Sequence, residues 1–124
     1  LPGIACIYYG DEAGMDGYRD PFNRKYYPWG REDTALQDFY RALGTLKKQE
    51  PALRSGDVTV VEAGGGRLMF LRRWEDETLA VCCNKSEEPW ELQHGGQLLF
   101  GGNLSSYLPQ KLVLAPGGYC LVRR

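Results

Sequence analysis

The stretch 57-DVTVVEAGGGRLMFLRRWEDETLAVCCN-84 decides the fold. Its short runs of Val, Leu, Phe, Thr and Trp are separated by the glycines at 64–66 and by an acidic turn at 75–77. β-Branched and aromatic residues between turn signals are typical of strands. The stretch therefore predicts strands over residues 58–63, 67–74 and 78–84.

The rest of the C-terminal part continues this pattern. Further strands are predicted at residues 90–93, 97–100, 111–114 and 119–122, with breaks at 86–89, 94–96, 101–107 and 116–118. Short strands with frequent turns are typical of an antiparallel β-sandwich. We therefore expect a mainly β chain.

Composition and charge exclude several classes of protein. The 124 residues include 15 Lys and Arg against 16 Asp and Glu, a balance that argues against a nucleic-acid binder and a membrane-surface protein. No apolar run approaches the roughly 20 residues of a transmembrane helix. The four cysteines form no CxxC pair and His94 is the only histidine, so we predict no metal site and no cofactor.

The cysteines are interpreted as small buried hydrophobes in a reducing compartment, which favours the cytoplasm. Cys82 and Cys83 are neighbours on a predicted strand, so their side chains should point to opposite faces. A disulfide from either of them to Cys120, on an adjacent strand, is the alternative.

The first fifty residues have a different pattern. Residues 4–9 are a continuous apolar run, which predicts a strand buried on both faces, and residues 10–31 predict a long loop. A helix should begin near Asp33 or Thr34 and end at Pro51. Its apolar stripe is Leu36, Phe39, Tyr40, Leu43 and Leu46. Because the sequence begins within a predicted strand, we expect it to be a fragment of a longer protein.

Three stretches in order carry a family resemblance: LPGIACIYYGDEAGM at 1–15, DPFNRKYYPWG at 20–30 and DFYRALGTLKKQEPALRSGD at 38–57. Together they resemble the C-terminal end of the α-amylase family (glycoside hydrolase family 13), above all its neopullulanase, cyclomaltodextrinase and maltogenic amylase group. Ala5 stands where the family usually has Pro, which removes a rigid kink but no chemistry. The resemblance implies that residues 1–55 are the last strand, loop and helix of a (β/α)8 barrel, and residues 56–124 an all-β domain.

The resemblance also implies an activity. The whole enzyme would be a retaining hydrolase of α-1,4 bonds, with α-1,6 bonds left open, in maltooligosaccharides, cyclodextrins or pullulan. Asp11 and Glu12 are adjacent and point to opposite sides, so they do not form a catalytic pair. The family's catalytic carboxylates lie on earlier strands. We therefore predict no catalytic residue here, an inactive fragment, and a carboxylate at 11 or 12 that fixes the loop.

Asp20 and Arg24 are the candidate substrate-binding residues. A carboxylate and a guanidinium four residues apart can both hydrogen-bond sugar hydroxyls. The resemblance implies that the two bind a glucose unit on the non-reducing side of the cleaved bond. The alternative is a surface ion pair of little energetic weight.

Aromatic residues and exposed apolar surface leave further hypotheses open. Aromatic rings in the loop either stack on sugar or anchor the chain; they are Tyr8, Tyr18, Tyr26, Tyr27 and Trp29. Trp74 and Trp90 either form a glycan-binding surface or pack in the β domain, which would then be structural or mediate assembly. An unpaired strand and an uncovered helix stripe predict a homodimer through the barrel remnant.

Overall fold

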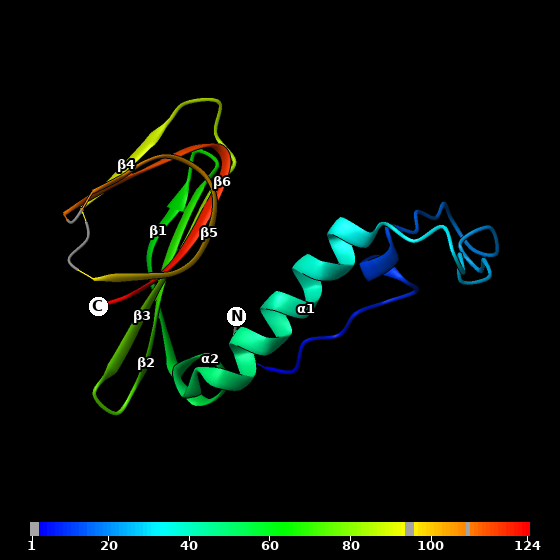
Figure 1. Cartoon of the computed structure of the whole chain (residues 1–124), viewed down its shortest axis with the longest axis horizontal. Coiled ribbons are helices and arrows are strands. Elements are labelled where there is room, and N and C mark those ends of the chain that lie inside the picture. The colour runs from blue at the N-terminus through cyan, green and yellow to red at the C-terminus, as the bar shows by residue number, and fades with distance from the viewer. Residues whose placement is uncertain (1–2, 94–95, 109) are drawn as a thin grey trace. The chain divides into compact units, whose positions relative to one another are not determined.

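The structure is a computed structural model that describes residues 3–93, 96–108 and 110–124; His94 lies outside them. The chain divides into two compact units, residues 3–50 and 51–124 (Figure 1). The predicted barrel remnant of residues 1–55 stays a prediction.

The second unit is mainly β, as predicted. It comprises a short helix, α2 (Pro51–Ser55), followed by β1 (Asp57–Gly64), β2 (Arg67–Trp74), β3 (Glu77–Asn84), β4 (Trp90–Gln93), β5 (Gln97–Leu108) and β6 (Lys111–Arg123). All pairings are antiparallel, in the order β1-β2-β3-β6-β4, and β5 pairs with β6.

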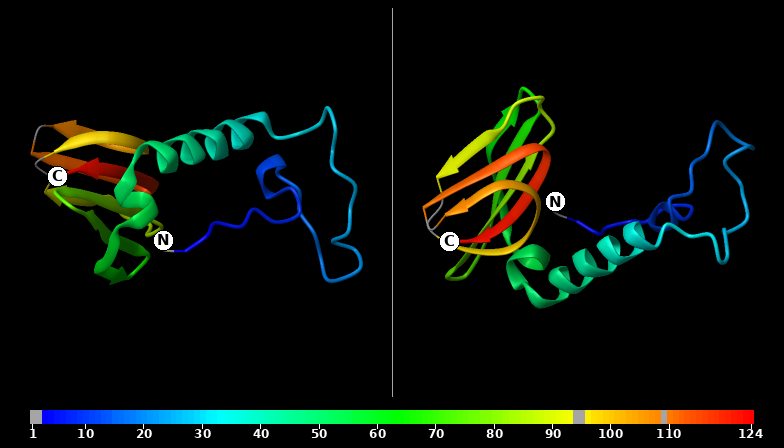
Figure 2. Two further views of the ribbon diagram at one scale, coloured as in Figure 1. Left: turned by 90° about the horizontal axis from the view of Figure 1, so that it is seen from below. Right: turned by 45° about the horizontal axis from the view of Figure 1, so that its top comes forward.

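Strand β6 gives the sheet its curl. Its C-terminal residues 119–123 pair with β3, whereas its N-terminal residues 111–114 pair with β4. On its other side β5 follows β6 along both parts. The antiparallel strands that we expected in a sandwich therefore belong to one continuous, curled sheet (Figure 2).

Two predicted breaks are wrong, because residues 101–107 lie within β5 and residues 116–118 within β6. Glycines in these stretches allow close approach between strands. A Cβ on Gly102 would lie 2.6 Å from the hydroxyl oxygen of Tyr119, and one on Gly118 would lie 2.8 Å from the carbonyl oxygen of Asn103 on β5. Glycine and register shifts bend a strand here instead of ending it.

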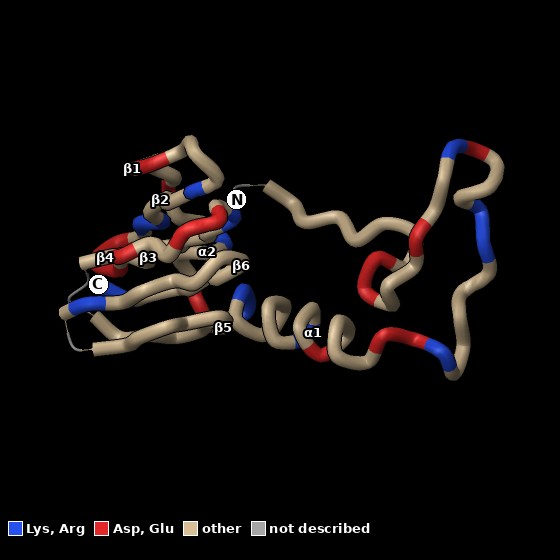
Figure 3. The backbone as a smooth tube through the Cα atoms, turned by 90° about the horizontal axis from the view of Figure 1, so that it is seen from above, with Lys and Arg blue, Asp and Glu red and all other residues tan. Residues whose placement is uncertain are grey.

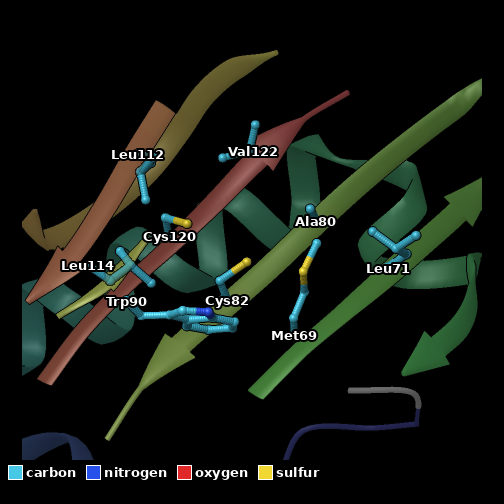
Figure 4. Close-up of a cluster of buried hydrophobic side chains, with 9 residues drawn as sticks. All are labelled: Met69, Leu71, Ala80, Cys82, Trp90, Leu112, Leu114, Cys120 and Val122. Carbon is cyan, nitrogen blue, oxygen red and sulfur yellow. The ribbon is translucent and has the colours of Figure 1, made fainter. Parts of the chain in front are cut away.

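A cluster of nine buried side chains packs on one face of the sheet (Figure 4). Its buried side chains are Met69, Leu71, Ala80, Cys82, Trp90, Leu112, Leu114, Cys120 and Val122. Cys82 and Cys120 are buried directly opposite each other, whereas Cys6 and Cys83 are exposed. All four are free thiols, so the alternative disulfide is not formed. The hydrogen bond with Cys120 and burial raise the pKa of the Cys82 thiol.

Two buried polar side chains connect the strands to the loops. Arg72 donates from Nε and Nη2 to the carbonyl oxygen of Gly56, at 3.2 and 2.8 Å, and so fixes the start of β1. Asn84 is 1% exposed, and its amide hydrogen-bonds with the loop before β4 and with β6. Such bonds satisfy groups that would be costly to bury alone.

The first unit contains the 3-10 turn η1 (Asp11–Ala13) and the helix α1 (Thr34–Gln49). Asp33 is the N-cap, since its Oδ1 accepts from the backbone N–H of Leu36 at 2.9 Å. Pro51 follows Glu50, the C-cap of α1, and begins α2. The apolar stripe of α1 contains no fully buried residue.

The strand predicted over residues 4–9 is not formed. Among the described residues 3–50 there is no strand at all, so the backbone of this segment has no ladder to join. Strand geometry requires such a partner. No helix within the described ranges has the length and apolar character needed to cross a membrane.

Candidate functional site

The loop over residues 10–31 begins with a tight turn around η1. Gly10 and Gly14 flank η1 with φ angles of 76° and 73°, a conformation that glycine adopts at little cost. The Oδ2 atom of Asp11 accepts a hydrogen bond from the backbone N–H of Tyr8 at 3.2 Å. Asp11 therefore holds the turn in shape, which is the structural role expected for a carboxylate at this place.

Asp20 and Arg24 contact each other in the middle of this loop. The Nε atom of Arg24 donates to Oδ1 of Asp20 at 2.7 Å, and Nη2 donates to Oδ2 at 3.1 Å. This bidentate ion pair fixes the relative orientation of the carboxylate and the guanidinium group. Their side chains nevertheless remain 60% and 65% exposed, so unused acceptor and donor positions face solvent. The peptide bond between Asp20 and Pro21 is cis.

A second ion pair closes the loop, which carries charges of both signs (Figure 3). The Nζ atom of Lys25 donates to the carbonyl oxygen of Asp16 at 2.9 Å and to its Oδ1 at 3.3 Å. This contact joins residues nine positions apart and brings the chain on either side of Asp20 together. Sequence analysis missed it, since nothing in the spacing distinguishes Asp16 from the other acidic residues of the loop.

Sequence analysis also missed Asn23, which lies between Asp20 and Arg24 in the quoted motif. Its Oδ1 atom is buried and has no hydrogen-bond partner among the described residues. Asn23 lines a small cavity of about 160 Å³; the other lining residues are Tyr8, Tyr9, Asp11, Met15, Asp16, Gly17 and Tyr18. A buried acceptor without a partner is uncommon in a folded protein.

The aromatic residues of the loop divide into two groups. Tyr27 anchors the loop, because its hydroxyl accepts from Nε2 of Gln37 on α1 at 2.8 Å and its ring lies 4.7 Å from that of Trp29. Tyr18, Tyr26 and Trp29 leave most of their surface exposed, 82% in the case of Trp29. These three rings are accessible for stacking.

The two tryptophans of the β unit have different environments. Trp90 is 5% exposed and belongs to the core, with the guanidinium carbon of Arg67 5.8 Å from its ring centre. Trp74 is 42% exposed at the end of β2 and lines an open hollow of about 450 Å³. Of the pair considered for glycan binding, only Trp74 is accessible.

The chemistry available in the loop is recognition through hydrogen bonds and ring stacking. Exposed carboxylate and guanidinium groups accept from and donate to hydroxyl groups, and aromatic rings cover apolar faces. Such an arrangement suits a neutral, hydroxyl-rich ligand.

Comparisons with known proteins identify relatives of the chain. It is 46% identical over 72 residues to an amylopullulanase of Thermoanaerobacter thermohydrosulfuricus, a match over 58% of this chain and 5% of that protein. It is 37% identical over 94 residues to a cyclomaltodextrinase of Geobacillus thermopakistaniensis, over 73% and 16% of the two proteins. No family model matches the chain. The chain thus spans between a twentieth and a sixth of these two relatives.

A solved structure supports the same relationship. The native debranching enzyme of Nostoc punctiforme superposes on the chain with a TM-score of 0.84 and 27% sequence identity. The match covers 100% of this chain and 29% of that enzyme.

Proposed function

The homologues of this chain are glycoside hydrolases of the α-amylase family (glycoside hydrolase family 13), and we propose that the chain is the C-terminal part of such an enzyme. In this proposal residues 1–55 complete a (β/α)8 barrel and residues 56–124 form the all-β domain that follows it. The whole enzyme hydrolyses α-1,4-glucosidic bonds of an α-glucan with retention, and α-1,6 bonds remain a second specificity to test.

Within that enzyme, Asp20 and Arg24 bind a glucose unit of the substrate. The observation that supports this role is the two-pronged hydrogen bond that orients both groups while leaving them well exposed. Loops at the C-terminal ends of barrel strands form the active sites of such barrels. A pre-oriented pair loses little entropy when it binds hydroxyl groups of a sugar.

The test replaces each residue in the whole enzyme. Asp20→Ala or Arg24→Ala should lower kcat/KM on maltotriose by about tenfold to a hundredfold, because a charge-assisted hydrogen bond contributes about 1.5–3 kcal/mol. Asp38→Ala is the matched control, since Asp38 forms an equally exposed ion pair with Arg41 on α1, also at 2.7 Å. Unchanged kinetics in both loop variants would show that Asp20 and Arg24 form only a surface ion pair and do not bind substrate.

The 124-residue chain by itself should be inactive. Retaining glycosidases need a nucleophile and an acid/base carboxylate about 5–5.5 Å apart. In this chain Asp11 is engaged in holding its turn, and we assign no residue to that chemistry. Hydrolysis of starch, pullulan or cyclodextrin that persists after repurification and is lost in Asp11→Asn or Glu12→Gln would contradict this assignment.

Exposed apolar side chains of the first unit support association of the isolated chain. Ile4 and Ile7 are both exposed, as are Tyr8 and Tyr9. We expect a homodimer through this barrel remnant, measured by light scattering; a monomer at all concentrations would contradict it. The free thiols support a reducing, cytoplasmic location, which cell fractionation would test.

A further inference from the structure

We propose that the β unit carries a saccharide-binding site of its own, in the hollow beside Trp74. The hollow measures about 450 Å³, within the range of roughly 300–1,000 Å³ that small-molecule sites occupy. Its lining residues are Pro51, Trp74, Glu75, Asp76, Glu77, Arg123 and Arg124. All belong to the unit of residues 51–124.

Strand pairing places the aromatic ring and a carboxylate side by side. Trp74 ends β2 and Glu77 begins β3, and the two are directly opposite each other as the last pair before the turn at residues 75 and 76. Side chains directly opposite in an antiparallel pair lie on the same face of the sheet. The exposed indole and the carboxylate of Glu77 therefore line the same hollow.

Glu77 is held from two further directions. Its Oε2 atom accepts from the backbone N–H of Ala52 in α2 at 3.2 Å, and its Oε1 atom lies 3.4 Å from Nε of Arg123 at the end of β6. Three elements that are distant in the sequence thus fix this carboxylate beside the ring. A group fixed in this way before a ligand arrives needs little ordering on binding.

The lining residues indicate the class of ligand. Three acidic residues and two arginines line the hollow, so its charges favour neither a simple anion nor a simple cation. It offers acceptors and donors to hydroxyl groups, and the indole and the Pro51 ring offer apolar walls. A pyranose ring has both hydroxyl edges and an apolar face. The geometry therefore matches a hexopyranose unit of an oligosaccharide.

The choice of an α-1,4-glucan as the ligand rests on the proposed function, whereas the existence of the site does not. Maltoheptaose is accordingly the probe, and cellohexaose, a β-1,4-linked glucan with one glucose unit fewer, is the comparison. The experiment uses the whole 124-residue chain labelled with ¹⁵N. Its three tryptophans give separate indole N–H signals, assigned from the Trp29→Phe and Trp74→Phe variants.

Titration with millimolar maltoheptaose should shift the Trp74 indole signal and leave that of the buried Trp90 in place. Trp74→Ala, followed through the backbone amide signals of the residues that line the hollow, should weaken the binding about tenfold, since ring stacking contributes up to about that factor beyond the area it buries. Glu77→Gln, which keeps the shape of the side chain, should weaken it by a smaller factor. Asp38→Ala, in the other unit and in an exposed ion pair with no binding role, should leave the affinity unchanged.

Other results would overturn the proposal. No shift of the Trp74 signal with either sugar would exclude a saccharide site in the hollow, and it would not contradict the proposed function. A shift confined to Trp29 and abolished by Asp20→Ala would assign the binding to the loop instead. A Trp74 shift with cellohexaose but not with maltoheptaose would keep a saccharide site and contradict the α-glucan assignment.

Discussion

Replacing Asn84 by Ala tests how the β unit is held together. The Nδ2 atom of Asn84 donates to the carbonyl oxygens of Glu88, Leu114 and Ala115 at 2.9, 3.0 and 3.2 Å. Its Oδ1 atom accepts from the backbone N–H and the hydroxyl of Ser86, at 3.1 and 2.6 Å. One side chain thus joins the end of β3, the loop before β4 and the middle of β6.

The loss in the free energy of unfolding depends on which groups lose a hydrogen-bond partner in Asn84→Ala. An amide has two protons, so two carbonyl oxygens lose a bond, and a buried acceptor left unsatisfied costs about 1–3 kcal/mol. The lost Oδ1 bonds add about 1 kcal/mol, because the groups of Ser86 reach water more readily. We expect a loss of about 3–7 kcal/mol, a large part of the roughly 5–15 kcal/mol that stabilises a domain.

The assay is denaturant unfolding of the whole chain, followed by the fluorescence of the buried Trp90. Ser86→Ala is the matched control, since it removes only the hydroxyl bonds and should cost about 1 kcal/mol. Asn84→Asp keeps the shape but turns a carboxylate oxygen toward carbonyl oxygens, so it should destabilise at least as much as Ala. A loss below about 1 kcal/mol in Asn84→Ala, with an unchanged denaturant slope, would refute the reasoning.

Two further changes test the core and a turn. The raised pKa of Cys82 means that the folded chain keeps a proton which the unfolded chain releases above its ordinary pKa of about 8.5. The same hydrogen bond lowers the pKa of Cys120, which offsets part of this effect. The stability that Cys82 contributes should therefore be present in full below the ordinary thiol pKa and be lost above it, and Cys82→Ala should flatten the fall of the unfolding midpoint from neutral to alkaline pH. An equally steep fall in the variant would contradict the role of Cys82. Gly66→Ala places a Cβ 2.8 Å from the backbone nitrogen of Ser86 at a φ of 77°, so it should lower the free energy of unfolding by about 2 kcal/mol or more. Gly65→Ala, at a φ of 54° with no neighbouring atom within 4 Å of the new Cβ, should lower it by about 1 kcal/mol. Thermal unfolding compares the two variants, and equal losses would exclude the clash with Ser86 as the cause.

Local pattern alone determined much of this protein. Alternation and turn residues placed β2 and β4 at their observed bounds, and the pattern of Asp33 followed by apolar residues at helical spacing placed α1. These features depend on neighbours in the sequence, through strand alternation and side-chain capping. The same local pattern predicted that Cys82 and Cys83 point to opposite faces, in agreement with one being buried and the other exposed. The prediction that the cysteines are buried is wrong for Cys6 and Cys83.

Tertiary structure decided what depends on partners distant in the sequence. The glycines of β5 and β6 predicted turns, yet these strands pass through them because each supplies the other's hydrogen bonds. Residues 4–9 predicted a strand, yet they form none, because the unit described over 3–50 offers no strand to pair with. The two tryptophans are alike in local context, but only the curl of the sheet buries Trp90 and leaves Trp74 beside a hollow. Exposure of a side chain is a property of the assembled surface, which no stretch of sequence contains.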